Sequence, residues 1–511
     1  IQRERISFAG PPGGVKARRT IDAAGMVVCP GFIDMHTHSE YALVADGRGL
    51  SKIHQGVTTE VFGEGSSPGP RRAGMNRGAR RYGVEPDWRS LREYFDRIQE
   101  QGISGNVMSY VAAGQLRRYV IGQEHRKPTS EELEQMKTLL AQAMEDGAIG
   151  LVAALETPGQ TQPSDAVPDT AELIELGKVV AQYGGIYGSH IRDQGARLLD
   201  SIAEAAEIGE KAGVPAEIFH LKAAGKPYFG KMKEALAAIE EARSRGVDLA
   251  ADIYPYIAAA HGLSIEVPRW AHEGGTERFL ERLADAALRP RIKREVTDYM
   301  TAKYYNEIED AGGFDAVVVS SVVRDAGRYV GKTIGQIARE QGKDPADMVL
   351  DLLIEQDANV GLVMFYMSEA DVTLGIQSPL TSICSDGTAI SPDRGGKPHP
   401  RYYGTFPRVL GRYVREKKAL GLEEAIRKMT CYPASRLGLE DRGQVREGMW
   451  ADLVVFDPDR IIDRATFEDP HQFPEGIEYV LVNGTTVVEK GRHTGALPGR
   501  VLYGPGRKSE T

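Results

Sequence analysis

The chain has 511 residues, of which 41% are hydrophobic and 26% charged, and its formal net charge is −9. The acidic balance and the absence of any Lys/Arg run argue against a nucleic-acid partner. No stretch reaches about 18 consecutive apolar residues, so we expect no membrane span and no membrane partner. The length suits a barrel of about 250 residues that carries insertions, together with a smaller domain.

Cysteine usage bears on the compartment. The three cysteines, Cys29, Cys384 and Cys431, show no metal-ligand spacing. A sparse, odd number of cysteines is typical of a reducing environment, so we expect a cytoplasmic protein without a disulfide framework. The chain begins at Ile1 rather than at a methionine, and we expect that further residues precede it.

The most informative segment comes early, at residues 30–38, where a short apolar run ends on His36 and His38. Side chains at positions i and i+2 of a strand point to the same face, so these two imidazoles project together. That arrangement suits two ligands of one metal ion. Two ordinary surface histidines in a turn are the alternative, and the rest of the chain has to decide between them.

Apolar, strand-like runs then alternate with helix-length segments along the chain. Helices are expected at residues 196–211 and 231–245, each with an apolar face and each followed by a glycine. With the first histidine strand, eight strands alternating with helices predict a parallel (β/α)8 TIM-type barrel. The seven further strands are expected at residues 57–63, 107–113, 148–154, 185–190, 216–221, 248–254 and 381–386.

Two regions do not fit the repeating pattern. Residues 255–380 are too long for one crossover, and we expect an inserted lid subdomain at about 262–350. A helical run at 423–437 is followed by strands at 451–457 and 479–488, the latter forming a hairpin at Asn483-Gly484. We therefore predict a small β-sandwich-like domain from residues 1–29 and 436–511, and a barrel domain over 30–435.

Potential metal ligands stand at the ends of four of the eight predicted strands. Catalytic residues of such barrels lie at the carboxyl ends of the strands, so these side chains would converge on one mouth. Any one of them could be a structural histidine, but the coincidence of all five predicts a metal centre. The five residues are His36, His38, His190, His220 and Asp386.

Nitrogen and carboxylate ligands with one open position suit Zn²⁺. Such an ion lowers the pKa of a bound water to about 7 and polarises a carbonyl group. Asp386 beside the ion can accept the proton of the water and later pass it to a leaving amine. The chemistry that these residues indicate is hydrolysis of an amide-like bond.

The motif set resembles the amidohydrolase superfamily, and within it the N-acyl-D-amino acid deacylase (D-aminoacylase) family. The resemblance extends over essentially the whole chain. Besides residues 30–38, the matching segments are His-Ile-Arg-Asp at 190–193, His-Leu-Lys at 220–222, Tyr-Pro-Tyr at 254–256, Ser-Asp-Gly at 385–387, and the runs 399–408 and 448–456.

The resemblance implies roles for further residues. The four histidines and Asp386 would hold one or two zinc ions, and Asp386 would also be catalytic. Lys222 and Tyr254 would bind the α-carboxylate of a small N-acyl amino acid. Arg192 and Arg401 could assist in binding this anion, although structural salt bridges are the more frequent fate of arginine.

One position departs from the family pattern. The metal-bridging cysteine of the family is missing, because residues 63–66 read Gly-Glu-Gly-Ser. A carboxylated lysine on the fourth strand is also excluded, because residues 148–156 contain no lysine. Glu64 could replace the thiolate as a ligand, or it could simply form hydrogen bonds within its glycine-rich loop.

The sequence thus predicts a zinc-dependent enzyme that hydrolyses N-acyl-D-amino acids or close analogues. One alternative is a cyclic-amide or dipeptide hydrolase on the same scaffold, which would keep the metal site but need no cation for an α-carboxylate. The other is a non-catalytic protein that retains only the fold.

Overall fold

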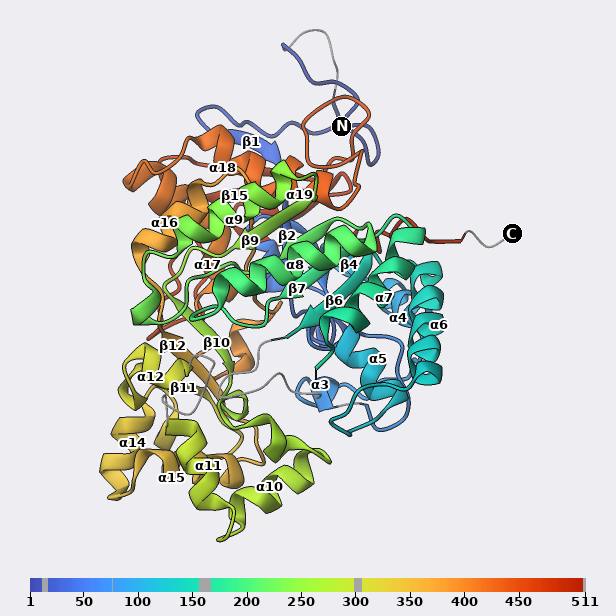
Figure 1. Cartoon of the computed structure of the whole chain (residues 1–511). Helices are drawn as coiled ribbons and strands as arrows, with labels where there is room; N and C mark the ends of the chain where they lie inside the picture. The colour runs from blue at the N-terminus through green and yellow to red at the C-terminus, as the bar shows by residue number, and fades with distance from the viewer. Residues whose placement is uncertain (12–16, 76, 156–166, 298–305, 509–511) are drawn as a thin grey trace.

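The computed structural model describes residues 1–11, 17–75, 77–155, 167–297 and 306–508. At its centre lies the predicted parallel barrel (Figure 1). Neighbouring strands pair in parallel, and a bridge between Thr37 and Gly387 joins the first strand to the end of the last. The strands are β2 (Phe32–Thr37), β3 (Val57–Phe62), the interrupted strand β4 (Asn106–Ser109) and β5 (Val111–Ala112), β6 (Gly150–Ala154), β7 (Ile186–His190), β8 (Ala216–Ile218), β9 (Leu249–Ile253) and β13 (Thr381–Ile383).

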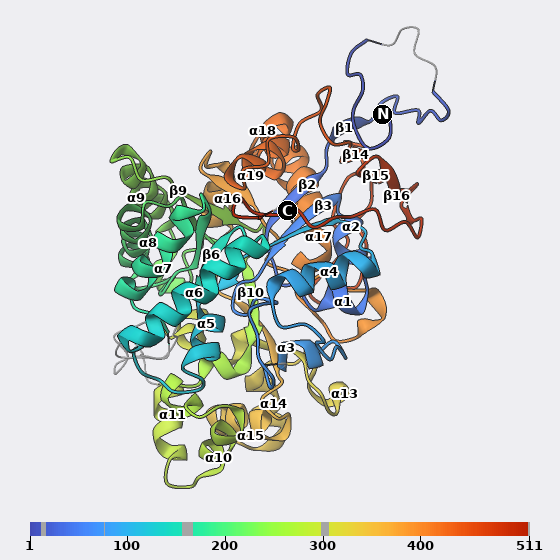
Figure 2. The ribbon, with the colours of Figure 1, turned by 90° about the vertical axis from the view of Figure 1, so that its right-hand side faces the viewer.

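Helices cover the outside of the barrel, and Figure 2 shows several of them side by side. They include α4 (Leu91–Gln101), α6 (Ser130–Asp146), α7 (Thr170–Gln182), α8 (Leu198–Ala212), α9 (Met232–Ser244) and α16 (Glu369–Gln377). The two helices predicted from their apolar faces, α8 and α9, are confirmed. Gly213 ends α8 in the left-handed conformation, with φ 69°, as the sequence predicted.

The predicted continuous helix at 423–437 is wrong in one respect. It is two helices, α18 (Leu422–Met429) and α19 (Cys431–Arg436), because Thr430 between them leaves the helical region with φ −135° and ψ −89°. Ala434 and Leu437, in and just after α19, pack against Ile33 and Met35 of the barrel interior. The apolar part of the barrel is therefore closed at the end away from the polar carboxyl ends of the strands.

A five-stranded antiparallel sheet combines the two ends of the chain. Its order is β1 (Val27–Pro30), β14 (Leu453–Phe456), β15 (Ile477–Val482), β16 (Thr485–Glu489) and β17 (Arg492–His493). The β15–β16 hairpin turns at Asn483 and Gly484, which both have positive φ, as the Asn-Gly pair predicted.

The segment inserted in the sequence between β9 and β13 forms a small antiparallel sheet and several helices of its own. Its antiparallel sheet has the order β10 (Ala258–Gly262), β12 (Gly361–Phe365) and β11 (Val317–Ser321). Figures 1 and 2 place this segment at the opposite end of the molecule from β1 and β15. Its helices include α10 (Thr276–Ala284), α11 (Arg289–Thr297), α12 (Glu307–Ala311), α14 (Ile334–Gln341) and α15 (Pro345–Glu355).

The predicted domain boundaries, at residues 29/30 and 435/436 and around the insertion at about 262–350, stay predictions.

Among the helices that the structure describes, none combines the length and the apolar character that crossing a membrane requires.

Candidate metal centre

Six potential ligands stand at or just after the carboxyl ends of five barrel strands, and we call them the mouth cluster. Five are the residues predicted from the strand ends, and the sixth is Glu64. The members are His36 and His38 from β2, Glu64 after β3, His190 at the end of β7, His220 after β8 and Asp386 after β13. The structure brings all six together.

Three of these residues form one half of the cluster. His38 Nε2 lies 3.0 Å from Asp386 Oδ1, and His36 Nε2 lies 4.0 Å from the same oxygen. One potential ligand atom from each of the three residues lies within 4.8 Å of the other two. They could hold one metal ion between them.

His190 and His220 form the other half, and Glu64 lies between the halves. His220 Nε2 is 3.1 Å from His190 Nδ1. Glu64 Oε1 is 3.2 Å from His190 Nδ1, while Glu64 Oε2 is 3.1 Å from His36 Nε2 and 3.4 Å from His38 Nε2. Each carboxylate oxygen of Glu64 thus faces one half, which is the arrangement of a bridging ligand.

These distances fit a metal centre. Ligand atoms bound to a tetrahedral zinc ion at about 2.0–2.2 Å lie roughly 3.3 Å from each other. The close pairs in the mouth cluster fall near this spacing, and all six donors are nitrogen or carboxylate oxygen, which zinc accepts. The residues present therefore fit the metal that the fold implies.

Neighbouring groups keep the two carboxyl groups of the mouth cluster ionised, which favours binding of a cation. Burial alone would raise the pKa of Glu64, but bonds to His190 and His36 hold it well below its ordinary value. Burial opposes ionisation of Asp386 as well, yet the charge of Arg401 and the neighbouring imidazoles keep the pKa of that carboxyl well below its usual range. Both side chains are therefore anionic at neutral pH.

Two of the histidines, His220 and His38, differ in the direction in which their pKa is shifted. Burial, together with the charge of Lys222, holds the pKa of His220 well below its ordinary value, so this ring is neutral and can bind a metal. Burial also opposes protonation of His38, but its bond to Asp386 and the charge of Glu64 raise its pKa to about 9. A proton on His38 thus occupies a place where a metal cation would also be stabilised.

The backbone is strained at two of the six positions. His220 has φ 38° and Asp386 has φ 45°, in the left-handed region that residues other than glycine seldom adopt. The Asp386 N–H donates to the carbonyl oxygen of His36 at 3.0 Å, which holds its loop against β2. Such strain persists only where the surrounding structure imposes it, and it is concentrated at functional sites.

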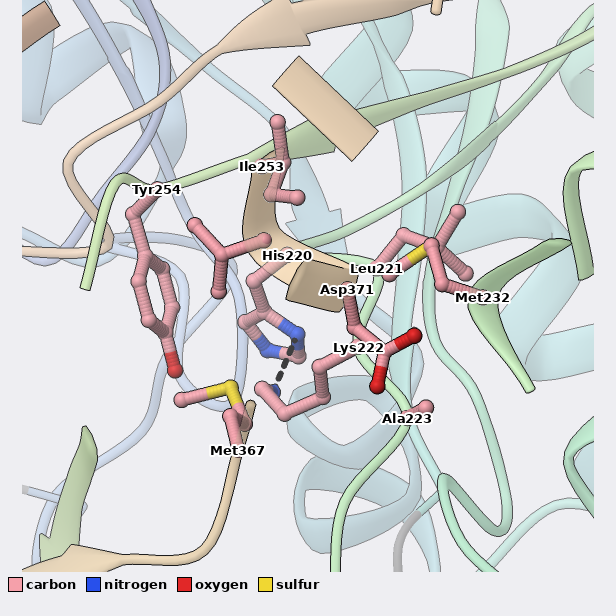
Figure 3. A pocket seen from close by; sticks show the side chains of 10 residues that line it. His220, Leu221, Lys222, Ala223, Met232, Ile253, Tyr254, Met367 and Asp371 are labelled. Atoms are coloured by element: carbon pink, nitrogen blue, oxygen red, sulfur yellow. Dashed lines mark hydrogen bonds between the residues drawn. The ribbon is translucent and has the colours of Figure 1, made fainter. Parts of the chain in front are cut away.

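Lys222 and Tyr254 lie next to His220, and Figure 3 shows the three side chains around one small cavity. Lys222 Nζ is 2.9 Å from His220 Nδ1 and 2.6 Å from Gln194 Oε1. The ammonium group lies 5.7 Å from the centre of the Tyr254 ring. The predicted anion-binding pair is therefore beside the mouth cluster.

The two predicted arginines have different surroundings. Arg401 Nη1 is 2.9 Å from Asp386 Oδ2, and its guanidinium lies 4.7 Å from the centre of the Tyr254 ring. Arg192 instead pairs with Glu204 of α8 at 2.8 Å and donates to the carbonyl oxygen of Pro168. The structure brings Arg401 into the site but gives Arg192 a structural salt bridge.

Gln194 was not predicted from the sequence. Its Nε2 lies 2.8 Å from His190 Nε2, and its Oε1 accepts the Lys222 bond, so one amide links His190 to Lys222. The only signal in the sequence was its place four residues after His190. A polar residue in a loop gives no indication of which partners it will meet.

Comparison with known proteins agrees with this geometry. Residues 19–488 match the model of a family described as the amidohydrolase family. A D-aminoacylase from Alcaligenes xylosoxydans xylosoxydans is 33% identical over 98% of this chain and 92% of its own length. An N-acyl-D-glutamate deacylase from the same organism is 32% identical over 98% of this chain and 91% of its own length.

Solved structures show the same likeness. A D-aminoacylase with a binuclear metal centre superposes with a TM-score of 0.79 at 33% identity, over 98% of this chain and 94% of that chain. An N-acyl-D-glutamate deacylase from Bordetella bronchiseptica, complexed with zinc and a phosphonate mimic of the tetrahedral intermediate, gives 0.81 at 31% identity with the same coverage.

Proposed function

Because the chain belongs to the amidohydrolase family, we propose that it hydrolyses the amide bond of N-acyl-D-amino acids to a carboxylate and a free D-amino acid. The observation that carries the proposal is the position of Lys222, Tyr254 and Arg401 directly beside the mouth cluster. A metal-dependent amidohydrolase needs only the cluster, whereas a substrate with an α-carboxylate also needs cations next to it.

We assign the metal ligands as follows. His36, His38 and Asp386 would hold one zinc ion, His190 and His220 a second, and Glu64 would bridge them. When bound, zinc activates a water molecule and polarises the substrate carbonyl. Two solved structures of similar proteins, a D-aminoacylase with a binuclear metal centre and an N-acyl-D-glutamate deacylase complexed with zinc, support this assignment.

Asp386 is the residue that moves the proton. Its two oxygens have different partners, with Oδ1 toward His38 and Oδ2 toward Arg401. The Arg401 charge keeps the carboxylate ionised and therefore able to accept the proton of the attacking water. Asp386 then donates this proton to the amine nitrogen as the C–N bond breaks, so the products are a carboxylate and an amine.

Lys222, Tyr254 and Arg401 would hold the α-carboxylate of the substrate. An ammonium group, a phenol and a guanidinium together supply directed donors to two carboxylate oxygens. Lys222 also contacts His220, so the anion would be held at a fixed distance from the metal ligands. This arrangement positions the amide for attack.

We also propose that the enzyme acts in the cytoplasm on small molecules. Cys29, Cys384 and Cys431 are all free thiols in the structure, which supports a reducing compartment. Two of the three are buried.

The test is a hydrolysis screen combined with metal quantitation. N-acetyl derivatives of D- and L-amino acids, a hydantoin and a dipeptide are assayed at equal concentration. We expect the N-acyl-D-amino acids to have the highest kcat/KM, and metal-stripped protein to be inactive until zinc is added. A preference for the hydantoin or the dipeptide would favour the alternative hydrolases, and full activity after metal removal would contradict the proposal.

A further inference from the structure

Beneath the mouth cluster, a buried carboxylate stands where a barrel strand is otherwise apolar. Asp252 lies on β9, two residues before Tyr254, and is fully buried between Ala251 and Ile253. Burying a carboxylate is costly unless polar groups compensate for it. Polar groups around Asp252 should therefore compensate for its burial.

The first partner is the backbone of a metal-centre residue. Asp252 Oδ1 accepts the N–H of His220, and the carbonyl oxygen of Asp252 accepts the N–H of Leu221 at 2.8 Å. His220 is the residue whose φ of 38° lies in the left-handed region. Asp252 thus fixes the strained turn that aims the His220 ring at His190.

The second partner comes from the opposite side of the mouth cluster. One ring nitrogen of His36, one oxygen of Asp252 and the sulfur of Cys384 all lie within 4.8 Å of one another. Among the described residues, His36 Nδ1 is buried without a hydrogen-bond partner, and Asp252 Oδ2 has no nitrogen or oxygen partner, although the Cys384 thiol interacts with the same carboxyl group. His36 Nε2 faces Glu64, so Nδ1 is the nitrogen left for Asp252.

We propose that Asp252 is a positioning residue that accepts the Nδ1–H of His36, directly or across one water, and so orients His36 and His220 together. A histidine that binds a metal through one nitrogen commonly donates the other N–H to a carboxylate, which fixes its tautomer and strengthens the ligand. Here one side chain would serve two ligands, because Oδ1 holds the turn at His220 and Oδ2 would accept from His36.

The proposal extends the proposed function to a residue that does not touch substrate. It depends on the metal centre but not on the identity of the substrate. Zinc affinity tests it directly, whereas the substrate screen tests only the activity.

The test compares Asp252→Asn with Glu217→Gln. Glu217 is an equally buried carboxylate on the neighbouring strand β8, and it pairs with Arg436 at 3.0 Å. In Asp252→Asn the amide oxygen can still accept the His220 N–H, but the amide nitrogen cannot accept a proton from His36. Both substitutions replace one buried carboxyl group of the barrel with an amide, so they are matched in size and burial.

The readouts are zinc affinity, by competition with a chromophoric chelator, and the melting temperature of the metal-free protein. We expect Asp252→Asn to bind zinc about 10–100-fold more weakly than wild type, and Glu217→Gln to bind it like wild type.

If Asp252→Asn does not fold, Cys384→Ala is measured in its place. This change removes only the third group near Asp252 and should weaken zinc binding less than tenfold. Zinc affinity within twofold of wild type in Asp252→Asn, an equal loss in both variants, or a greater than tenfold loss in Cys384→Ala would overturn the proposal. Wild-type protein that binds no zinc would overturn it as well.

Discussion

Two clusters of histidine and carboxylate side chains lie in different regions of this molecule. The mouth cluster is built on the barrel, while an insertion cluster consists of His261, Glu266 and Glu307. His261 Nε2 lies 3.3 Å from Glu266 Oε1 and 3.3 Å from Glu307 Oε2. In both regions, three potential ligand atoms come within 4.8 Å of one another. Donor chemistry alone therefore does not distinguish them.

The supporting structure does distinguish them. The mouth cluster takes six donors from five parallel strands of one barrel, and two of these donors are on residues with positive φ. The insertion cluster takes three donors from β10, the short helix η2 (Leu263–Glu266) and α12, and none of the three is among the residues with positive φ. Rigid strand ends and imposed strain identify the catalytic region more reliably than the number of ligands.

The largest expected effect separates the two clusters directly. His220→Ala should lose zinc and lower kcat/KM by about 10³-fold or more, because metal catalysis supplies several kcal/mol of transition-state stabilisation. His261→Ala, the matched change in the insertion cluster, should retain the wild-type zinc content. Zinc is measured by mass spectrometry on both purified variants. Loss of zinc in His261→Ala but not in His220→Ala would reverse the distinction.

A second change tests the bridge within the mouth cluster. Glu64→Gln keeps the shape of the side chain but removes the charge that faces both halves. We expect the zinc content to fall from two equivalents to about one, because a neutral amide is a poorer ligand for a cation than a carboxylate. If Glu64→Gln retains two equivalents of zinc, Glu64 stabilises its own loop and does not bind the metal.

A third change moves from the metal to the substrate anion. Lys222→Ala should raise KM for N-acyl-D-amino acids by about 10–100-fold, since a hydrogen bond to a charged group contributes about 1.5–3 kcal/mol. An N-acyl amine without a carboxylate is the control substrate and should be affected far less. Because Lys222 also contacts His220, zinc content is measured in parallel. Equal losses on both substrates would make Lys222 a support of the metal ligands.

The sequence predicted the barrel because apolar strands alternate with helices, and it predicted five site residues because four of the eight strands end on a potential metal ligand. Both signals are local in the sequence. The roles of Arg192 and Arg401 could not be separated in this way, because both arginines lie in segments that match the family motifs, residues 190–193 and 399–408. Only the fold reveals that Arg192 pairs with Glu204 on α8, whereas Arg401 pairs with Asp386.

The contacts of Asp252 could not be predicted from the sequence either. A carboxylate within an apolar strand was visible in the sequence, but its partners come from β2 and the loop after β8. These contacts depend on strand register and on the closure of the barrel, which no spacing along the chain encodes. The prediction of a continuous helix at 423–437 failed for a smaller reason, the conformation of Thr430 alone.

The smallest expected effect concerns the contact between the insertion and the barrel. Asp310 of α12 is buried near Asp193, and burial together with that neighbouring charge raises the pKa of Asp310 to about 7. The folded protein therefore binds more protons than the unfolded chain between about pH 4 and pH 7. It follows that the unfolding free energy falls as pH rises through this window.

Asp310→Asn should remove this pH dependence, because the amide carries no charge at any pH. We expect the melting temperature of the variant, relative to wild type, to be about 1–3 °C more favourable at pH 8 than at pH 5. Asp315→Asn is the control, since Asp315 also lies in the insertion but pairs with Arg339, which lowers its pKa, so it is ionised at both pH values. The same shift at both pH values in Asp310→Asn would show that the two carboxyl groups do not oppose each other. The contact between the insertion and the barrel would then involve no repulsion between Asp310 and Asp193, and it would depend on packing alone.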